Sequence, residues 1–213
     1  NISDWYVKNF DAVFEVSKDS TMTVTENISA DCGDLSDKHG IFRVLPTVMY
    51  RNGKEVSTPL YLISITDFNG RSYHYEEISD LLNNTVTWKI GDKDIDVHGV
   101  NNYRIKYKYK NVVDITDPSK AKDRFYWNLT GNFWNLEIDN FTAKVVFPAG
   151  FLKDKSSVSY SVGKLGSLES KGLVFNWDSE SSFTLKYSYP LPNETGISVD
   201  MSVEKGFFIP YQF

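Results

Sequence analysis

Glu26 is a carboxylate on a strand face that the sequence predicts to be buried. It falls in phase with Met22 and Ile28, two apolar positions of an alternating segment. An unpaired charge in an apolar interior is costly, so this carboxylate requires a cation. Arg43, inside the apolar run 40–46, is the expected partner because its planar guanidinium can bond both carboxylate oxygens. We therefore predict a structural ion pair between Glu26 and Arg43 in preference to a catalytic carboxylate.

Two acidic clusters carry oxygen ligands of the kind that calcium prefers. The first is formed by Asp92, Asp94 and Asp96. Its spacing begins a calcium loop, but Val97 stands where the sharp-turn glycine is needed and Tyr103 where the bidentate glutamate would lie. The second is formed by Asp31, Asp34 and Asp37. We favour a polar hairpin for the first cluster and a solvated loop for the second, with no metal bound. Weak calcium binding is the alternative.

Other residue types that carry chemistry lack the required spacing. His39, His74 and His98 lie far apart, with no His-x-His or Glu-x-x-His pair that would indicate zinc. No serine lies in a Gly-x-Ser-x-Gly motif, and no glycine-rich segment has the pattern of a phosphate-binding loop. The single cysteine, Cys32, cannot form an internal disulfide and is in phase with buried positions. The sequence therefore predicts neither an enzyme nor a bound cofactor.

The composition limits the classes of partner. The chain has 213 residues, with 28 acidic and 23 basic side chains and a formal net charge of -5. A broad basic face for nucleic acid or anionic lipid is not expected from this balance, because such faces need clustered Lys and Arg. No segment approaches the roughly 20 apolar residues that a membrane-spanning helix requires.

Alternating apolar and polar residues predict strands along most of the chain. The predicted strands lie at 10–16, 22–32, 61–65, 86–90, 95–97, 103–109, 141–147, 158–162, 183–189 and 197–203. The segment 103–109 is the clearest, because four large apolar side chains alternate with three basic ones. Asn-Gly pairs at 52–53 and 69–70 predict tight turns, and 86–97 is expected to form one hairpin. A short helix is expected only at 76–82.

This pattern predicts an all-β protein, an antiparallel β-sandwich that is immunoglobulin-like or larger, with minimal helix. Residues 1–213 would form one β domain. A weak similarity between 141–151 and 197–207 leaves open two stacked subdomains, 1–150 as the main sandwich and 151–213 as a smaller one.

Four motifs occur in a definite order along the chain. They are Val24-Thr25-Glu26, the run 40–46, Ile90-Gly91-Asp92 and the run 123–134. Their order and spacing resemble a bacterial family of predicted membrane proteins, the domain of unknown function 2207. The strongest part of the resemblance, of unknown role, is Tyr126, Trp127, Asn128, Thr130, Gly131, Asn132 and Trp134. Arg124 departs from the family pattern, which usually has an acidic residue there, so a role for an acidic pair at 123–124 does not carry over.

The resemblance implies a location but no biochemical activity. It implies an export signal before this segment, and hydrophobic spanning segments with a low-complexity tail after it. Asn1 and Phe213 would then be the limits of an ectodomain on the extracytoplasmic side of the cell membrane. Its attachment to the membrane would come from segments outside residues 1–213.

We therefore expect a non-catalytic binding or structural module at the cell envelope, whose partner is an unknown envelope protein or glycan. Nucleic acid is not expected. The alternative is a carbohydrate-binding module for a cell-wall or surface glycan, in which Trp127 and Trp134, with Tyr126 and Phe133, stack on sugar rings. The competing interpretation is that alternate residues of this run fill the core while Asn128 and Asn132 bond backbone in a turn.

Overall fold

The computed structural model describes residues 4–115, 117–131 and 133–213. The strands are β1 (Tyr6–Val16), β2 (Met22–Asp31), β3 (Gly40–Pro46), β4 (Val48–Arg51), β5 (Lys54–Ser57), β6 (Leu60–Thr66), β7 (Tyr75–Asp80), β8 (Thr85–Gly91), β9 (Val100–Tyr109), β10 (Val113–Asp114), β11 (Lys122–Asn128), β12 (Phe141–Val146), β13 (Ser157–Gly163), β14 (Leu173–Ser179), β15 (Ser182–Tyr187) and β16 (Gly196–Glu204). One 3-10 turn spans Lys153–Lys155. None of the described helical segments is long and apolar enough to cross a membrane.

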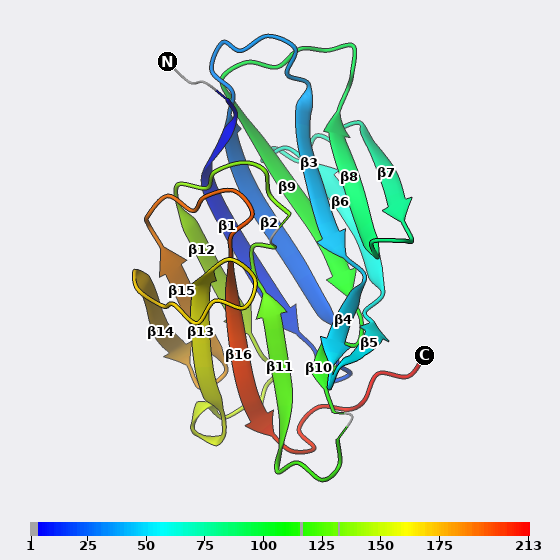
Figure 1. Ribbon diagram of the computed structural model, residues 1–213, viewed down its shortest axis with the longest axis vertical. Coiled ribbons are helices and arrows are strands. Elements are labelled where there is room, and N and C mark those ends of the chain that lie inside the picture. The colour runs from blue at the N-terminus through cyan, green and yellow to red at the C-terminus, as the bar shows by residue number, and fades with distance from the viewer. Residues whose placement is uncertain (1–3, 116, 132) are drawn as a thin grey trace.

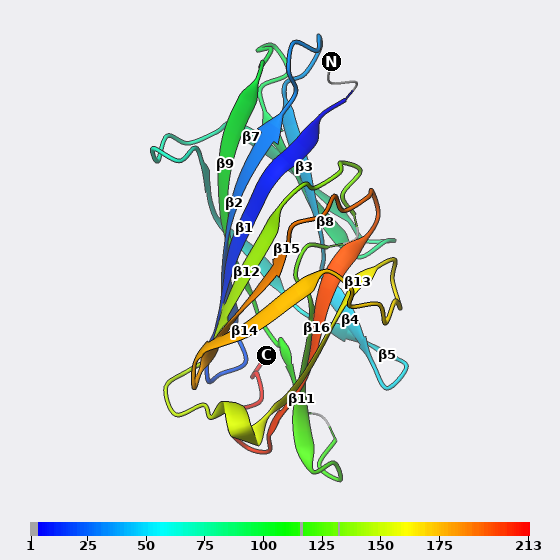
Figure 2. The same ribbon diagram turned by 90° about the vertical axis from the view of Figure 1, so that its left-hand side faces the viewer.

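The strands form two layers, as the sequence predicts for an all-β sandwich (Figures 1 and 2). One layer is a seven-stranded sheet in the order β14-β15-β12-β1-β2-β9-β6. The other layer consists of a four-stranded sheet, β10-β11-β16-β13, and a three-stranded sheet, β3-β8-β7, with the β4-β5 hairpin beside them. Among the described strands of these sheets, the pairing between β1 and β12 is parallel and the others are antiparallel.

The centre of the large sheet is the predicted opening hairpin together with the predicted strand 103–109. β1 pairs with β2 over most of its length, and β2 pairs with β9 from Met22 opposite Tyr109 to Asp31 opposite Val100. Burial alternates along both strands, and every second residue of β2 from Met22 to Ala30 is buried. One face of the sheet therefore builds the core and the other faces solvent, as a half-buried antiparallel sheet requires.

Two local predictions in the three-stranded sheet were wrong. The expected helix at 76–82 is strand β7 followed by a turn, because Tyr75 to Asp80 pairs with β8 at the edge of the sheet. The expected hairpin at 86–97 does not form, because β8 pairs instead with β7 and with β3, which lies far earlier in the chain. Residues 92–99 are a loop that connects β8 to β9.

The two Asn-Gly pairs make different turns. Asn52 and Gly53 both have positive φ, 51° and 73°, and close the β4-β5 hairpin as predicted. At the second pair only Gly70 has a positive φ, and the Asp67 carboxylate accepts the backbone N–H groups of Asn69 and Arg71. A side chain therefore shapes the second turn.

A division at residue 150 would cut both large sheets. β12 precedes this position and pairs with β15, which follows it. β11 likewise pairs with β16 across the same position. The two similar Gly-Phe segments meet in space, because the rings of Phe151 and Phe207 lie edge to face with centroids 5.6 Å apart. The stacked rings of Phe147 and Phe151, with centroids 4.2 Å apart, continue the aromatic core across residue 150.

Gly40 and Gly91 face each other at one end of the three-stranded sheet. A Cβ atom on Gly40 would lie 1.7 Å from the carbonyl oxygen of Ile90, and one on Gly91 would lie 2.0 Å from that of His39. No side chain fits at either position without moving backbone. Two of the family motifs, 40–46 and 90–92, therefore contain glycine because their backbones touch.

We predict that Gly40→Ala lowers the free energy of unfolding by about 3 kcal/mol, because the backbone must separate to admit the methyl group. Such a loss corresponds to a melting temperature lower by roughly 10 °C for a chain of this size, which differential scanning calorimetry would record. Gly53→Ala is the matched control, since its φ is also positive but nothing lies within 4 Å of the added Cβ. Its expected cost is about 1 kcal/mol; equal costs at the two positions would contradict the steric explanation.

Candidate functional site

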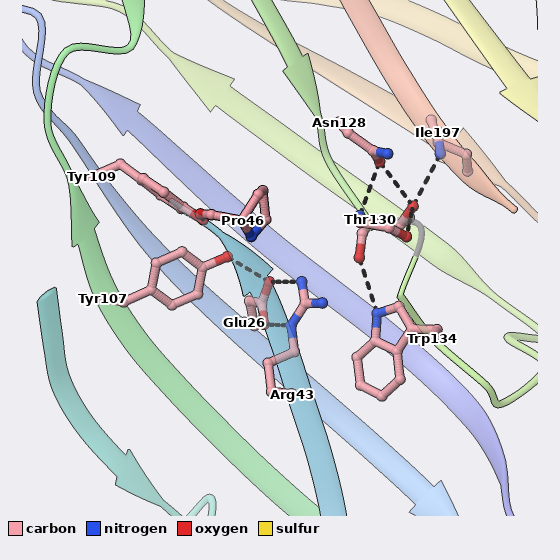
Figure 3. A network of polar contacts seen from close by, with 10 residues as sticks. Glu26, Arg43, Pro46, Tyr107, Tyr109, Asn128, Thr130, Trp134 and Ile197 are labelled. Carbon is pink, nitrogen blue, oxygen red and sulfur yellow. Dashed lines mark hydrogen bonds and ion pairs between the residues drawn. The ribbon is translucent and has the colours of Figure 1, made fainter. Parts of the chain in front are cut away.

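The structure brings Glu26 and Arg43 together in the interior, between the two layers (Figure 3). Nε of Arg43 donates to Oε1 of Glu26 at 2.7 Å, and Nη2 donates to Oε2 at 2.6 Å. The carboxylate is 0% exposed and the guanidinium 1%. Glu26 comes from β2 of the seven-stranded sheet and Arg43 from β3 of the three-stranded sheet. The ion pair therefore joins two sheets that share no backbone ladder among the strands the structure describes.

Aromatic side chains enclose this ion pair. The hydroxyl group of Tyr107 donates a third hydrogen bond to Glu26, at 2.7 Å from Oε2. The guanidinium of Arg43 lies 4.9 Å from the ring centroid of Trp134 and 5.6 Å from that of Phe10. Tyr109, the next inward residue on β9, donates to the carbonyl oxygen of Pro46 at 2.6 Å. Both ends of the pair are thus satisfied by neighbours from several elements.

Burial and the ion pair act in opposite directions on Arg43. Burial alone would lower the pKa of Arg43, but the charge and hydrogen bonds of Glu26 outweigh it and hold this pKa above its usual value. Burial, with the Glu26 carboxylate next, raises the pKa of Tyr107 well above that of a free tyrosine. Tyr107 is therefore a neutral donor across the pH range in which proteins work.

The motif 126–134 folds over the ion pair. Trp134 donates from Nε1 to the carbonyl oxygen of Thr130 at 2.9 Å, and the Thr130 hydroxyl accepts the N–H of Ile197 at 3.0 Å. Asn128 accepts the N–H of Gly131 at 2.9 Å (Figure 3). The buried Thr130 thus links this segment to β16 and fixes the indole above Arg43.

Gly131 also lies against the ion pair. Its φ is 76°, and a Cβ atom there would lie 3.2 Å from Nη1 of Arg43. The sequence marks this glycine as part of a motif, but its contact with Arg43 depends on a loop that no periodicity describes. Asn132, the remaining motif residue, lies outside the described residues.

The tryptophans fill the core. Trp5, Trp88, Trp127 and Trp134 are all buried. Trp177 is half-buried, with its ring edge to face against Phe175 and Phe183. Of the four aromatic residues suggested as a sugar platform, Trp127 packs against Phe125 and Tyr109, and Tyr126 lies beneath the guanidinium of Arg124. Only Phe133 is well exposed. The tryptophans therefore do not form an open stacking surface.

The acidic clusters form turns and one contact with a histidine. Asp92 accepts the N–H of Asp94, and Asp31 accepts the N–H of Gly33. Asp96 lies 3.3 Å from Nδ1 of His39. Within residues 4–115, 117–131 and 133–213, no group of three or more His, Cys, Asp or Glu side chains is arranged to hold a metal ion. Cys32 is buried.

Residues 123 and 124 point in opposite directions from β11. Asp123 is buried, 3.0 Å from Nζ of Lys205, and also accepts the N–H of Gly206. Arg124 faces solvent and forms two hydrogen bonds of 2.8 Å with Asp200 of β16. Consecutive residues of a strand lie on opposite faces. An acidic side chain at 124 would therefore not form a pair with Asp123.

Two open cavities lie at the surface. The larger, of about 410 Å³, lies beside the Gly40-Gly91 contact, and Asp4, Lys38 and Lys89 are among its lining residues. The smaller, of about 340 Å³, is lined by Asp117, Lys122 and other charged residues. Both carry mixed charges, and Lys38 is paired with Asp4 across the first. Neither contains Glu26 or Arg43.

The fold and this buried site define a two-layered all-β domain whose sheets are joined by a central ion pair. A family described as "Predicted membrane protein (DUF2207) N-terminal domain" matches residues 6–202, and the chain belongs to that family. The uncharacterized protein YciQ of Escherichia coli (strain K12) is 25% identical over 196 residues, which are 85% of this chain and 29% of that protein. The chain thus spans less than a third of the length of that relative.

Solved structures show the same fold at much lower identity. Yeast LTA4 hydrolase in complex with bestatin and native yeast LTA4 hydrolase both match with a TM-score of 0.57, at 12% and 13% identity. These matches cover 93% and 94% of this chain but only 29% of each hydrolase chain. The likeness therefore concerns the fold and carries no activity with it.

We predict that Glu26→Leu and Arg43→Met each lower the free energy of unfolding by about 3–5 kcal/mol, because each leaves one buried charge without its partner. The double variant E26L/R43M should lose much less than the sum, since neither charge of the pair is then left buried without its partner. Urea denaturation of the wild type, the two single variants and the double variant gives the coupling energy between Glu26 and Arg43. Additive losses would contradict a mutual dependence of the two charges.

Tyr107→Phe should lower the free energy of unfolding by about 1.5–3 kcal/mol, because it removes a buried hydrogen bond to a charged group. The matched control is Tyr50→Phe, since Tyr50 also donates to a carboxylate, that of Glu55, but at 3.3 Å on the surface. The control should change stability by less than about 0.5 kcal/mol. Chemical denaturation measures both, and equal effects would contradict the role of burial.

Proposed function

We propose that this chain is the extracytoplasmic domain of a bacterial membrane protein and acts as a non-catalytic binding or structural module at the cell envelope. Membership of a family described as the N-terminal domain of predicted membrane proteins supports an attachment to the membrane. The E. coli relative, of which this chain matches 29%, supports a bacterial setting and a larger whole protein.

The observation that carries the non-catalytic role is the use of the buried charges. Glu26 and Arg43 satisfy each other and are enclosed by Tyr107, Trp134 and Phe10, with 1% or less of either side chain exposed. A catalytic carboxylate must reach its substrate. Here the carboxylate instead holds two sheets together, which is what a rigid module requires.

The carbohydrate-binding alternative requires exposed coplanar aromatic side chains in a groove. Four of the five tryptophans are buried and Trp177 packs half-buried against phenylalanine rings. These positions weigh against that alternative, so we favour a module that binds through its outer polar surfaces or serves as a rigid support.

The location can be tested with a single introduced cysteine. Cys32 is fully buried and should not react with a maleimide in the folded protein. Ser170, in the exposed connection between β13 and β14, can be replaced by cysteine in the full-length protein, with any cysteine outside this domain changed to serine. We expect a membrane-impermeant maleimide to label Ser170→Cys in intact cells.

The protein without the Ser170 substitution is the control and should remain unlabelled until it is denatured. Labelling of Ser170→Cys only after the cells are lysed would place the domain in the cytoplasm and contradict the proposed location.

A further inference from the structure

The outer face of β9 carries a row of cations. Arg104, Lys106 and Lys108 alternate with the buried Tyr103, Ile105, Tyr107 and Tyr109, so they lie together on the solvent side of the seven-stranded sheet. Lys110 continues the row, because its Nζ lies 4.7 Å from the ring centroid of Tyr61 on the same face. Alternate residues of a strand are roughly 7 Å apart. We call these four residues the cationic row.

The neighbours of the row on both sides are neutral and capable of hydrogen bonding. On β2, Asn27 lies opposite Arg104, Thr25 opposite Lys106 and Thr23 opposite Lys108. On β6, Thr66 lies opposite Arg104, Ser64 opposite Lys106 and Tyr61 opposite Lys108. Each of these three cations is thus flanked by one amide or hydroxyl side chain on each side.

The charge of the row is not compensated. Among the residues that the structure describes, no carboxylate forms a salt bridge with any of the four cations. Arg104 donates to the neutral Asn27 and lies over the ring of Phe68. Asp11 and Glu15 lie on β1, beyond β2, about 10 Å to the side of the row.

Protection of a sheet edge does not explain these charges. Lysine on an edge strand prevents unwanted pairing, but β9 lies between β2 and β6 and is paired on both sides. Figure 2 shows the large sheet edge-on, with the other described sheets stacked on its inner face and none on its outer face. The cations are therefore concentrated on a paired strand of a chain whose net charge is -5.

We propose that the cationic row is a docking site for an extended phosphodiester polymer, in which one phosphate alternates with a short polyol spacer. This inference deepens the proposed binding role by naming a class of ligand. Lys binds phosphate as a point charge, and three of the four cations are Lys. The flanking Thr25, Ser64 and Thr23 supply neutral donors and acceptors for polyol hydroxyl groups between the phosphates.

The shape of the charge distribution favours a linear occupant over a flat anionic membrane. The row is one strand wide, with neutral outer-face residues beside it on β2 and β6 and the acidic residues Asp11 and Glu15 on β1. A bilayer surface laid on this face would extend past the row to those carboxylates and to Lys144 and Lys186 on β12 and β15, so its contacts would not be confined to β9. A narrow polymer that follows β9 meets only the cations.

The test uses the purified chain and a fluorescein-labelled oligomer of glycerol phosphate, with binding followed by fluorescence anisotropy at increasing salt. We expect binding at low salt that weakens as salt is raised, since phosphate contacts release counterions. The double variant K106E/K108E should bind at least about tenfold more weakly. Its log-log salt slope should be smaller by about 1.4, from about 0.7 for each lost contact.

The matched control is K144E/K186E, which makes the same charge change on the same face of the same sheet but on β12 and β15, outside the row. It should bind within about twofold of wild type if the contacts are local. The four substituted lysines have their side chains on the outer face, and melting curves verify that each variant is folded. Equal weakening by both double variants would overturn the proposal, as would absence of binding at low salt.

Two further probes separate other occupants. Vesicles that contain phosphatidylglycerol, or a polyglutamate peptide, should bind the chain more weakly than the phosphate oligomer does. Equal or tighter binding of the vesicles would assign the row to a membrane surface, and equal or tighter binding of polyglutamate would assign it to an acidic protein. Either result overturns the polymer assignment. Because this assay uses the purified domain, its outcome is independent of the cysteine-labelling test of location.

Discussion

The ion pair between Glu26 and Arg43 sets the constraint on which the remaining architecture depends. Each ion loses several kcal/mol of hydration when it is buried, and only a partner in good geometry offsets that loss. Apolar contacts between the layers are non-directional, whereas the two hydrogen bonds of 2.6 and 2.7 Å fix the position of β3 relative to β2. Since no backbone ladder joins these sheets in the described part of the chain, the pair and the hydrogen bond from Tyr109 to Pro46 are directional contacts that define how the three-stranded sheet lies on the seven-stranded one.

Motifs that are far apart in the sequence meet around this pair. The first supplies Glu26 and the second Arg43, while the run 123–134 supplies the glycine and the indole that enclose the guanidinium. Thr130 then connects that enclosure to β16 through its hydroxyl group. The remaining motif contributes Gly91, whose contact with Gly40 closes the far end of β3 against β8. The motifs thus describe one structural unit: a buried charge, its partner, the cover over them and the strand that carries the partner.

The sequence predicts this unit in part. The alternation of apolar and polar residues along 22–32 places Glu26 in the interior, and a buried carboxylate requires a cation. The ion pair therefore follows from residue types and periodicity. The contact of Trp134 with Arg43 does not follow, because it depends on the path of a loop.

The helix predicted at 76–82 is wrong because the segment is a strand at the edge of a sheet. Almost all residues of β7 are exposed. Its sequence therefore lacks the alternation of apolar and polar residues from which a half-buried strand is predicted. β14 also lies at an edge and was not predicted, although Leu173, Phe175 and Trp177 face the core. The hairpin predicted at 86–97 does not form because β8 pairs with β3 and β7.

The net charge of the whole chain does not describe the charge that a ligand would meet on the outer face of β9. A net charge of -5 predicts repulsion of polyanions at long range. At contact distance, however, a ligand experiences the charges within about one screening length, roughly 8 Å in physiological salt. Strand alternation places Arg104, Lys106 and Lys108 on one face at intervals of roughly 7 Å, whereas carboxylates such as Asp200, Asp67 and Asp92 are engaged in an ion pair or in turns. The same period of two that buries the tyrosines which enclose Glu26 therefore exposes the cations. Because the inner residues of β9 are fixed by the ion pair, the spacing of its outer residues is fixed with them. A linear ligand on this face would contact cations whose spacing is fixed by the same strand that packs its tyrosines into the core.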